Sequence, residues 1–335
     1  MNQLVELGIG LVSLVALIAG SEKLVSHCSA LMKEKQISGT FIGLVVISIG
    51  TSLPEIVAHI LASAEIITGD LNYNVASGTT LGMNIGSDII QQNLLIGLVA
   101  LFGSLEVTDT FVRRDLAMLI GAAAAVWIFG YAGVLTRWEG GLLAAGYLVY
   151  LAFVFRDRRE NPRSPVSERR GPPRTRQVSR AKWIHWAWIF GGLAVILTGG
   201  HFALNSVQYF VESLGIGGSM IGVAVIGVGT ALPELSTAVS GIRRGQSDLS
   251  ISTLVGSNIT NPLFAIGIGA LISTYSVPDA LVYYDLPFKI ATAFLIFAIF
   301  WRNRSISRPE GVILVASYFV YLGLRLYLFP SDLFV

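Results

Sequence analysis

Ten apolar stretches, most of them about 20 residues or longer, constrain the fold of this 335-residue chain more than any other feature. A helix of about 20 apolar residues is long enough to cross the hydrocarbon core of a bilayer. Several stretches are longer than a straight crossing needs, which predicts tilted, bent or broken helices. We therefore predict an all-α polytopic membrane protein with ten transmembrane helices. The stretches cover residues 3–22, 38–66, 75–103, 114–135, 138–155, 183–210, 216–241, 250–274, 284–301 and 309–329.

Composition supports a membrane protein and excludes several other classes. Charged residues make up 13% of the chain, about half of the ~25% typical of soluble domains, whereas hydrophobic residues make up 53%. These values exclude a cytosolic enzyme, a nucleic-acid-binding domain and a disordered chain. Cys28 is the only cysteine, so a disulfide framework and a cysteine-rich metal site are excluded too. We expect the lipid bilayer as a partner, no nucleic acid and no cofactor, and the sequence predicts no oligomeric state.

Basic residues follow the first, third, fifth, seventh and ninth stretches, whereas the other loops are mostly acidic. The densest basic segment, 156–182, holds ten Lys or Arg residues, three Asp or Glu residues and several prolines. Such a segment is too polar and too rich in proline to form a packed core, which favours a linker. Because cytoplasmic loops carry an excess of Lys and Arg, we predict a multi-pass protein of the cell membrane (inner or plasma membrane). Both termini should lie outside and the linker in the cytoplasm.

Two segments of the chain repeat each other at an offset of 179 residues. Residues 43–55 read GLVVISIGTSLPE and residues 222–234 read GVAVIGVGTALPE, with eight of thirteen positions identical. A second motif follows each, Gly-Ser-Asp-Ile at 86–89 and Gly-Ser-Asn-Ile at 256–259. Each copy contains five apolar stretches, and an odd number makes the second copy enter the membrane in the opposite sense. We therefore predict a 5+5 inverted-topology repeat, with helices 1–5 in residues 1–155, the linker at 156–182 and helices 6–10 in residues 183–335.

The repeated motif places a carboxylate, Glu55 or Glu234, directly after a proline inside an apolar stretch. A charge at that depth costs at least ~2.5–3.5 kcal/mol, so it should face protein or water and have a partner. Each proline lacks an N–H and disturbs the preceding turn, which should free backbone carbonyls near Thr51 and Ser48 in one half and near Thr230 and Gly227 in the other. The motifs contain no Lys or Arg. Because hard cations such as Ca²⁺ prefer oxygen ligands of these kinds, we predict that a bound cation or a proton is the partner.

The second motif adds neutral oxygen donors. Ser87 and Gln91 lie four residues apart and therefore on one face of a helix, as do Ser257 and Asn261. Such a pair alone is typical of helix packing in membranes. Its position in a repeated motif favours the cation site instead.

Two further residues near the motifs keep more than one interpretation. Asp88 is a site ligand, a proton carrier or a structural cap, and Asn258 replaces it in the second copy. His59 follows Glu55 by one helical turn and either hydrogen-bonds that glutamate or packs as a neutral side chain.

The duplicated Gly-Thr-Ser/Ala-Leu-Pro-Glu, followed by Gly-Ser-Asp/Asn-Ile, resembles the two alpha repeats of the calcium:cation antiporter superfamily, the sodium/calcium exchangers and their relatives, in a prokaryotic form. The resemblance covers essentially the whole chain. It implies that helices 2, 3, 7 and 8 form an ion-binding core and that the long helices 1 and 6 slide across it. It also implies a metal site made of the carboxylates of Glu55 and Glu234, the hydroxyls of Thr51, Ser52, Thr230, Ser87 and Ser257, the carbonyls of Ser48 and Gly227, and the amides of Gln91 and Asn261.

Three positions depart from the pattern of archaeal sodium/calcium exchangers. This chain has Gln91 in place of a short Asn, Asn261 in place of an Asp and Ala231 in place of a Ser. The first repeat is also nine residues longer between its two motifs, around residues 66–78, which predicts an outer loop or a helix extension. These departures leave the counter-ion, Na⁺ or H⁺, and the stoichiometry open.

The residues and the resemblance together predict a secondary active antiporter and not an enzyme. It would exchange Ca²⁺ or a related divalent cation for Na⁺ or H⁺ by alternating access, because an empty site with two charged carboxylates is too costly to occlude. With Glu55 and Glu234 alone ionised, one Ca²⁺, two Na⁺ or two protons neutralise the site, which predicts nearly electroneutral exchange. The alternative is a non-transporting cation-sensing or structural protein on an exchanger fold.

Overall fold

The computed structural model of the chain describes residues 3–32, 44, 48–103, 105–160, 182–215, 217–243 and 247–332, and every structural statement below concerns these residues. They form a predominantly helical bundle with two short antiparallel strand pairs. The prediction of a helical architecture is confirmed.

Seven helices precede the gap at 161–181 and eight follow it within the described residues. The first set is α1 (Gln3–Met32), α3 (Ser48–Thr51), α4 (Leu53–Thr68), α5 (Tyr73–Ile89), α6 (Ile96–Phe102), α7 (Ala117–Gly130) and α8 (Arg137–Glu160). The second set is α9 (Lys182–Leu214), α10 (Gly218–Ile221), α11 (Gly227–Thr230), α12 (Leu232–Arg243), α13 (Ser247–Thr260), α14 (Ile266–Ile272), α15 (Leu286–Asn303) and α16 (Arg308–Leu328). Wider π-helical turns, which are frequent at functional sites, extend several helices at Ile90–Leu95, Phe111–Leu116, Gly222–Ile226, Asn261–Ala265 and Leu281–Asp285.

Among the described residues, six continuous helical segments are long and apolar enough to cross a membrane. They are Tyr73–Phe102, Arg137–Asp157, Gly218–Val239, Ser250–Ile272, Leu281–Asn303 and Arg308–Leu328. Each of the ten predicted stretches contains described helix. A multi-pass membrane protein is therefore supported, whereas the count of ten crossings stays a prediction.

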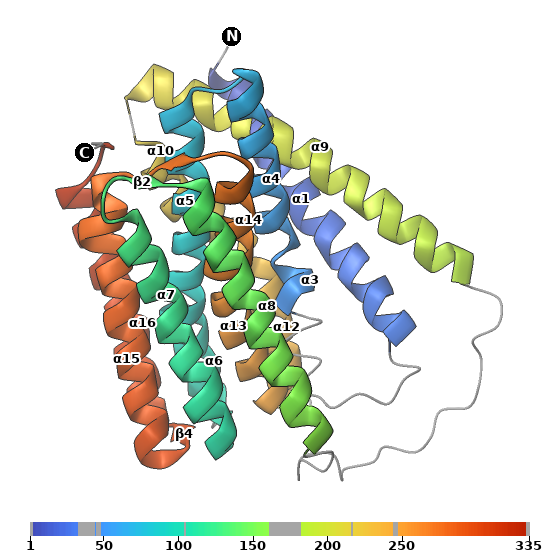
Figure 1. The fold of residues 1–335 in the computed structure, drawn as a ribbon, viewed down its shortest axis with the longest axis vertical. Helices are drawn as coiled ribbons and strands as arrows, with labels where there is room; N and C mark the ends of the chain where they lie inside the picture. Colours follow the sequence, from blue (N-terminus) through green and yellow to red (C-terminus); the bar gives the residue numbers. More distant parts are fainter. Residues whose placement is uncertain are drawn as a thin grey trace.

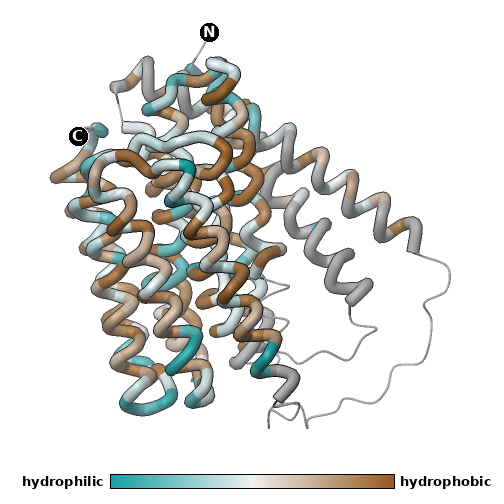
Figure 2. The backbone as a smooth tube through the Cα atoms, in the orientation of Figure 1, coloured by the Kyte–Doolittle hydropathy of each residue, from teal (hydrophilic) through white to brown (hydrophobic). Residues whose placement is uncertain are grey.

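The outer helices present apolar side chains to their surroundings. Phe294 on α15 and Phe319 and Tyr327 on α16 are exposed. Figure 2 shows hydrophobic residues along the lengths of these helices and hydrophilic residues at the turn that joins them. A large exposed apolar surface of this kind is suited to lipid.

The extra residues of the first repeat extend two helices. α4 continues to Thr68 and α5 begins at Tyr73, so a short turn is the only interruption between them. Gly69 closes α4 with a φ of 80°, which glycine adopts without strain. The side chain of Asn72 then caps α5 by accepting hydrogen bonds from two backbone N–H groups at 3.0 and 3.2 Å. The structure thus places residues 66–78 mostly in helix.

The two parts of the chain pack against each other in a crossed arrangement. α6 packs against α16, and α14 packs against α8. A Cβ at Gly97 would lie 2.8 Å from the carbonyl oxygen of Gly311, and a Cβ at Gly267 would lie 3.1 Å from that of Gly140. Small residues let membrane helices approach this closely. The same helix contact therefore occurs twice, at sequence positions that differ by 170 or 171.

Two strand pairs tie loops together at opposite ends of the bundle. β1 (Leu105–Glu106) pairs with β4 (Ser305–Ile306), and β2 (Val134–Leu135) pairs with β3 (Tyr275–Ser276). Figure 1 shows β2 at the end that carries both termini and β4 at the other end. α8 finishes toward the β4 end, away from the termini. α8 continues to Glu160, and the rest of the predicted linker lies outside the described residues up to Lys182.

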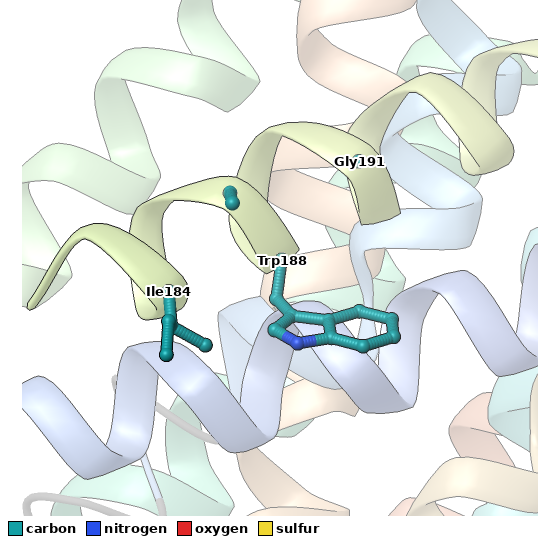
Figure 3. Close-up of a pocket in the computed structure, with 4 residues that line it drawn as sticks. Ile184, Trp188 and Gly191 are labelled. Carbon is teal, nitrogen blue, oxygen red and sulfur yellow. The ribbon is translucent and has the colours of Figure 1, made fainter. Parts of the chain in front are cut away.

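The long helices α1 and α9 lie side by side along one edge of the bundle (Figure 1). The Lys23 ammonium lies 5.7 Å from the ring centre of Trp188 between them. Ile184 and Trp188 line an open hollow of about 500 Å³ on α9, and Figure 3 shows both side chains directed toward the neighbouring helix. This hollow is lined by apolar groups and contains none of the motif residues.

Candidate cation site

Glu55 and Glu234 each lie in the first turn of a helix that follows a local interruption. α3 ends at Thr51 and α4 begins at Leu53, whereas α11 ends at Thr230 and α12 begins at Leu232. In each case a proline occupies one of the first two helical positions, where its missing N–H leaves no helical hydrogen bond unmade. The interruption predicted from the prolines is therefore present in both halves and spans a single residue.

Both carboxylates are fully buried, with 0% of each residue exposed. Oε2 of Glu55 and both carboxylate oxygens of Glu234 have no hydrogen-bond partner among the described residues. The two groups are also close enough to repel each other when ionised. Burial of an unpaired carboxylate costs several kcal/mol, so these three oxygens are the atoms that a cation or a proton would stabilise.

Hydroxyl groups from α3, α5 and α13 lie close together around the first motif. The Ser87 hydroxyl on α5 donates to Oε1 of Glu55 at 3.0 Å. Across the halves, the hydroxyls of Thr51 and Ser257 lie 3.3 Å apart, on α3 and α13. Ser48 also reaches α13, through a 2.9 Å contact with the hydroxyl of Thr260. The structure thus joins the first motif of one half to the second motif of both.

The two motif threonines face the glutamates in a crossed pattern. Thr230 neighbours Glu55, and Thr51 neighbours Glu234 together with Ser257. In the described structure, neither Thr51 nor Ser257 donates a hydrogen bond to Glu234. The hydroxyl of Ser52, at the interruption of the first motif, is buried and has no partner in the described structure. The predicted hydroxyl ligands other than Ser52 therefore lie next to the two carboxylates.

Glycines allow the motif helices to approach each other closely. A Cβ at Gly227 would lie 2.8 Å from the backbone nitrogen of Ser87, and a Cβ at Gly256 would lie 2.9 Å from the Cβ of Ser48. Any side chain at these two positions would separate α11 from α5 or α13 from α3. The glycines of the repeated motifs therefore serve to hold the oxygen-bearing side chains together.

The carbonyl oxygens of Ser48 and Gly227 already accept two hydrogen bonds each. One comes from the backbone N–H four residues later, at 3.0 and 3.2 Å, and the other from the threonine hydroxyl three residues later, at 3.3 and 3.4 Å. Each proline offers no N–H to the carbonyl four residues before it, which belongs to Gly50 or Gly229 in the preceding helix. The Gly229 carbonyl nevertheless accepts a hydrogen bond from the Ala231 N–H. The carbonyls of Ser48 and Gly227 are thus engaged within the protein, and their role as cation ligands stays a prediction.

The amide side chains of Gln91 and Asn261 each form a hydrogen bond with a residue on the other one's helix. Gln91 donates to the Ser87 hydroxyl at 3.1 Å and accepts from the Asn258 amide at 3.2 Å. Asn261 donates to Oδ1 of Asp88 at 2.8 Å, and its own Oδ1 has no partner. Each amide thus binds the residue at the aspartate position of the opposite half. Only the Asn261 oxygen is left available as a ligand in this arrangement.

Asp88 is part of a buried ion pair. Its Oδ2 is paired with Nζ of Lys289 on α15, while its Oδ1 accepts the hydrogen bond from Asn261. The side chains of Asp88 and Lys289 are 0% and 1% exposed. Of the three interpretations of Asp88, this geometry favours the structural one, because both of its oxygens have protein partners.

Lys289 is the residue that the sequence interpretation missed. The repeated motifs contain no Lys or Arg, whereas Lys289 lies outside them in the apolar stretch 284–301. The sequence nevertheless indicates this residue, because a lone Lys inside a membrane-spanning stretch requires a partner of opposite charge. The same holds for Arg325 in the last stretch, whose Nε is 3.0 Å from Oδ2 of Asp285.

His59 has a different partner from Glu55. Its Nδ1 lies 3.1 Å from the hydroxyl of Tyr275, which also contacts the Ser63 hydroxyl at 2.7 Å. His59 is fully buried, and its Nε2 has no partner in the described structure. The geometry favours the packed histidine of the two interpretations.

No group of three or more His, Cys, Asp or Glu side chains suited to a metal ion occurs in the part of the chain that the structure describes. The candidate site therefore consists of two carboxylates supplemented by hydroxyl and amide oxygens. Hard cations accept such mixed oxygen ligands. The low number of charged ligands suits a cation that is bound and released.

Buried carboxylates on interrupted helices within a helical membrane bundle define a secondary transporter architecture. The chain belongs to the sodium/calcium exchanger protein family, whose model matches residues 5–156 and 184–327. The resemblance noted in the repeated motifs is therefore confirmed.

Two relatives match almost the whole chain. A putative antiporter CaxA from Alkalimonas amylolytica is 29% identical over 328 residues, which covers 96% of this chain and 98% of the relative. The sodium/calcium exchanger MaX1 of Methanosarcina acetivorans is 26% identical over 352 residues, with 95% and 97% covered. A solved structure of the sodium-calcium exchanger NCX_Mj has the same fold, with a TM-score of 0.64 at 22% identity over 96% of this chain and 99% of that one.

Proposed function

We propose that this protein is a secondary active antiporter that exchanges Ca²⁺ or a related divalent cation for Na⁺ or H⁺ across the cell membrane. The exchange takes place at Glu55 and Glu234. The observation that carries this proposal is the set of three fully buried carboxylate oxygens without partners. A cation supplies the missing counter-charge, and the site cannot return empty because an occluded pair of bare carboxylates is too costly.

The relatives support exchange without fixing the counter-ion. MaX1 is named for sodium and calcium, whereas CaxA is named only as a putative antiporter. Ser52 and the hydroxyls of Thr51, Thr230, Ser87 and Ser257 are the neutral ligands in this proposal. The unpartnered oxygen of Asn261 is a further ligand.

Alternating access is assigned to α1 and α9. These two long helices lie against each other at the edge of the bundle, with α1 in contact with α3 and α11 and α9 in contact with α4. They therefore lie over the interrupted helices of both motifs. Sliding of this pair would open the site to one side of the membrane at a time.

We further propose the 5+5 inverted topology, with both termini outside and the linker in the cytoplasm. The crossed glycine contacts, the strand pairs at opposite ends and the two separate matches to the family model support it. A cysteine placed in segment 156–182, in a background without Cys28, should be unreactive to impermeant thiol reagents applied to intact cells. A cysteine near Asp279 should react. The opposite pattern would overturn the assignment.

The charge of the site favours nearly electroneutral exchange. Lys289 neutralises Asp88 within its ion pair, which leaves Glu55 and Glu234 as the carboxylates that need a cation. One divalent cation or two monovalent cations suffice. In liposomes with the voltage clamped by K⁺ and valinomycin, Ca²⁺ flux should hardly depend on voltage, and a steep dependence would contradict the charge count.

Uptake of ⁴⁵Ca²⁺ by proteoliposomes tests the function and identifies the counter-ion. An imposed Na⁺ gradient and an imposed pH gradient are compared, and one of them should drive accumulation. Glu55→Gln should abolish it, whereas the matched control Glu106→Gln, at an exposed strand residue, should transport normally. Saturable Ca²⁺ binding with no flux under either gradient would favour a cation-sensing protein instead.

A further inference from the structure

Lys289 supplies a fixed positive charge close to the proposed cation site. Its ammonium is almost completely buried and pairs with Asp88, which directly follows Ser87, the residue that hydrogen-bonds Glu55. The charge of Asp88 is close enough to act on Glu55. Removal of either member of the ion pair would therefore change the electrostatic potential at the proposed site.

The ion pair is held in place on both sides. Gln92 on the helix of Asp88 donates to the backbone carbonyl of Lys289 at 2.8 Å and to the hydroxyl of Thr292 at 2.5 Å. Asn93 donates to the same hydroxyl at 3.3 Å. These bonds tie α15 to the π-helical turn that contains Gln91. The ammonium is thus positioned by its backbone as well as by its counter-ion.

The pair has no counterpart in the other half. An offset of 170 residues relates Asp88 to Asn258 and Lys289 to Leu119. Asn258 is neutral and Leu119 is buried and apolar. Helix packing of this fold therefore does not require an ion pair at this position, because the second copy of the arrangement is neutral. A buried ion pair also contributes little net stability compared with a well-packed neutral pair.

We propose that Lys289 is a resident counter-cation that neutralises Asp88, keeps this carboxylate out of the transported-ion site and so limits the exchangeable charge to Glu55 and Glu234. This inference rests on the proposed function, because it concerns the same site. Lys289 acts at the site only through Asp88. It is thus a residue that determines charge and affinity, not a ligand.

Equilibrium binding of ⁴⁵Ca²⁺ to the purified full-length protein in nanodiscs tests the proposal. Asp88→Asn leaves an unpaired ammonium, so the Kd for Ca²⁺ should rise at least about tenfold. Lys289→Met leaves an unpaired carboxylate, so the Kd should fall by a similar factor. The double variant keeps the net charge of the unmodified protein and copies the neutral pair of the second half. Its Kd should lie within about threefold of the unmodified value.

A second buried ion pair on α15 provides the matched control. Asp285 is bonded to Arg325 and to the hydroxyl of Tyr321, and the three side chains are fully buried. No contact with a candidate ligand of the cation site is found for this pair in the described structure. Asp285→Asn and Arg325→Met should lower the unfolding temperature and leave the Kd for Ca²⁺ unchanged.

The proposal is supported if the Kd for Ca²⁺ shifts in opposite directions in the two single variants and returns to nearly the unmodified value in the double variant. Shifts in the same direction, no shifts, or equal shifts in the control pair overturn it. A Lys289→Met chain that is unfolded at low cation concentration should fold when Ca²⁺ is added, because the freed carboxylate binds it, and no recovery counts against the proposal. Liposome assays distinguish failure of the proposed antiport function from failure of the proposed role of Lys289. Opposite Kd shifts in a protein that transports no Ca²⁺ would refute only the antiport function. If the unmodified protein binds no Ca²⁺, the same variants are measured with ²²Na⁺.

Discussion

The two halves of the protein share a backbone pattern but differ in their charged side chains. Both interrupt a helix at the residue directly before Leu-Pro-Glu, and both have a π-helical turn shortly after the second motif. Both also bond an aspartate to a tyrosine, Asp115 to Tyr150 at 2.9 Å and Asp285 to Tyr321 at 2.6 Å. The repeated backbone therefore positions equivalent oxygen atoms on both sides of the site.

The charged groups near the site are unequal. The first half has Asp88 with its partner Lys289, whereas the second half has Asn258. Glu55 accepts a hydrogen bond from Ser87, whereas both oxygens of Glu234 have no partner in the described structure. The comparison teaches that duplication supplies the framework of ligands, while individual substitutions set the charge that has to be neutralised.

The largest effect is expected from removal of either central carboxylate. Glu55→Gln and Glu234→Gln should each reduce divalent exchange by about 100-fold or more, because the main attraction for the cation is lost. Unfolding temperatures without Ca²⁺ should hold or rise, and the rise should be larger for Glu234→Gln, since both of its oxygens are unpartnered. ⁴⁵Ca²⁺ uptake and thermal unfolding measure these effects. Normal transport by either variant would show that the site lies elsewhere.

The asymmetry at the aspartate position predicts the next largest effect. Asn258→Asp copies the first-half residue into the second half, where Leu119 stands in place of a lysine. A buried carboxylate without a partner should lower the free energy of unfolding by ~3 kcal/mol. Chemical denaturation measures the loss, and Asn258→Ser serves as the uncharged control. An Asn258→Asp variant as stable as the control would mean that the second half has its own counter-charge.

Asn261→Asp should make Ca²⁺ binding and stability depend more strongly on pH. Asn261 donates to Asp88 at 2.8 Å, so the substitution replaces a donor by a carboxylate that faces another carboxylate. One of the two groups must then bind a proton or a cation. Without Ca²⁺, the unfolding temperature of the variant should fall as the pH rises, because the repulsion grows as both groups ionise. A pH profile parallel to that of the unmodified protein would contradict this reading.

The smallest effects are expected at the interruptions themselves. Ser52 has a buried hydroxyl without a partner, and Ala231 is the corresponding residue of the second half. Ser52→Ala should weaken Ca²⁺ binding by about tenfold and leave the stability unchanged or raise it by ~1 kcal/mol. Ala231→Ser should strengthen binding by a few-fold through the added oxygen. Calcium titrations of both variants measure the change in binding. If the two substitutions change only the stability and leave Ca²⁺ binding unchanged, Ser52 is not a ligand.

Much of the architecture could be predicted because it depends on local patterns. Apolar stretches indicated helices, and the family match confirms the relationship that the repeated motifs suggested. The positions of Glu55 and Glu234 after prolines predicted an interrupted helix, which both halves contain. The carbonyl of Ser48 accepts a backbone hydrogen bond, because the hydrogen-bond ladder around Ser52 continues across the interruption.

The sequence by itself determined that this chain is a helical membrane protein of the exchanger family and that two carboxylates lie in its repeated motifs. Hydropathy, proline positions and internal repetition are properties of short segments, so they can be read without coordinates. Only the tertiary structure decided that Lys289 pairs with Asp88, across 201 positions of sequence. It also decided that Gln91 and Asn261 bind each other's helices. The physical reason is that burial leaves a charged group dependent on whichever partner the packed helices bring near, and no local pattern specifies that partner.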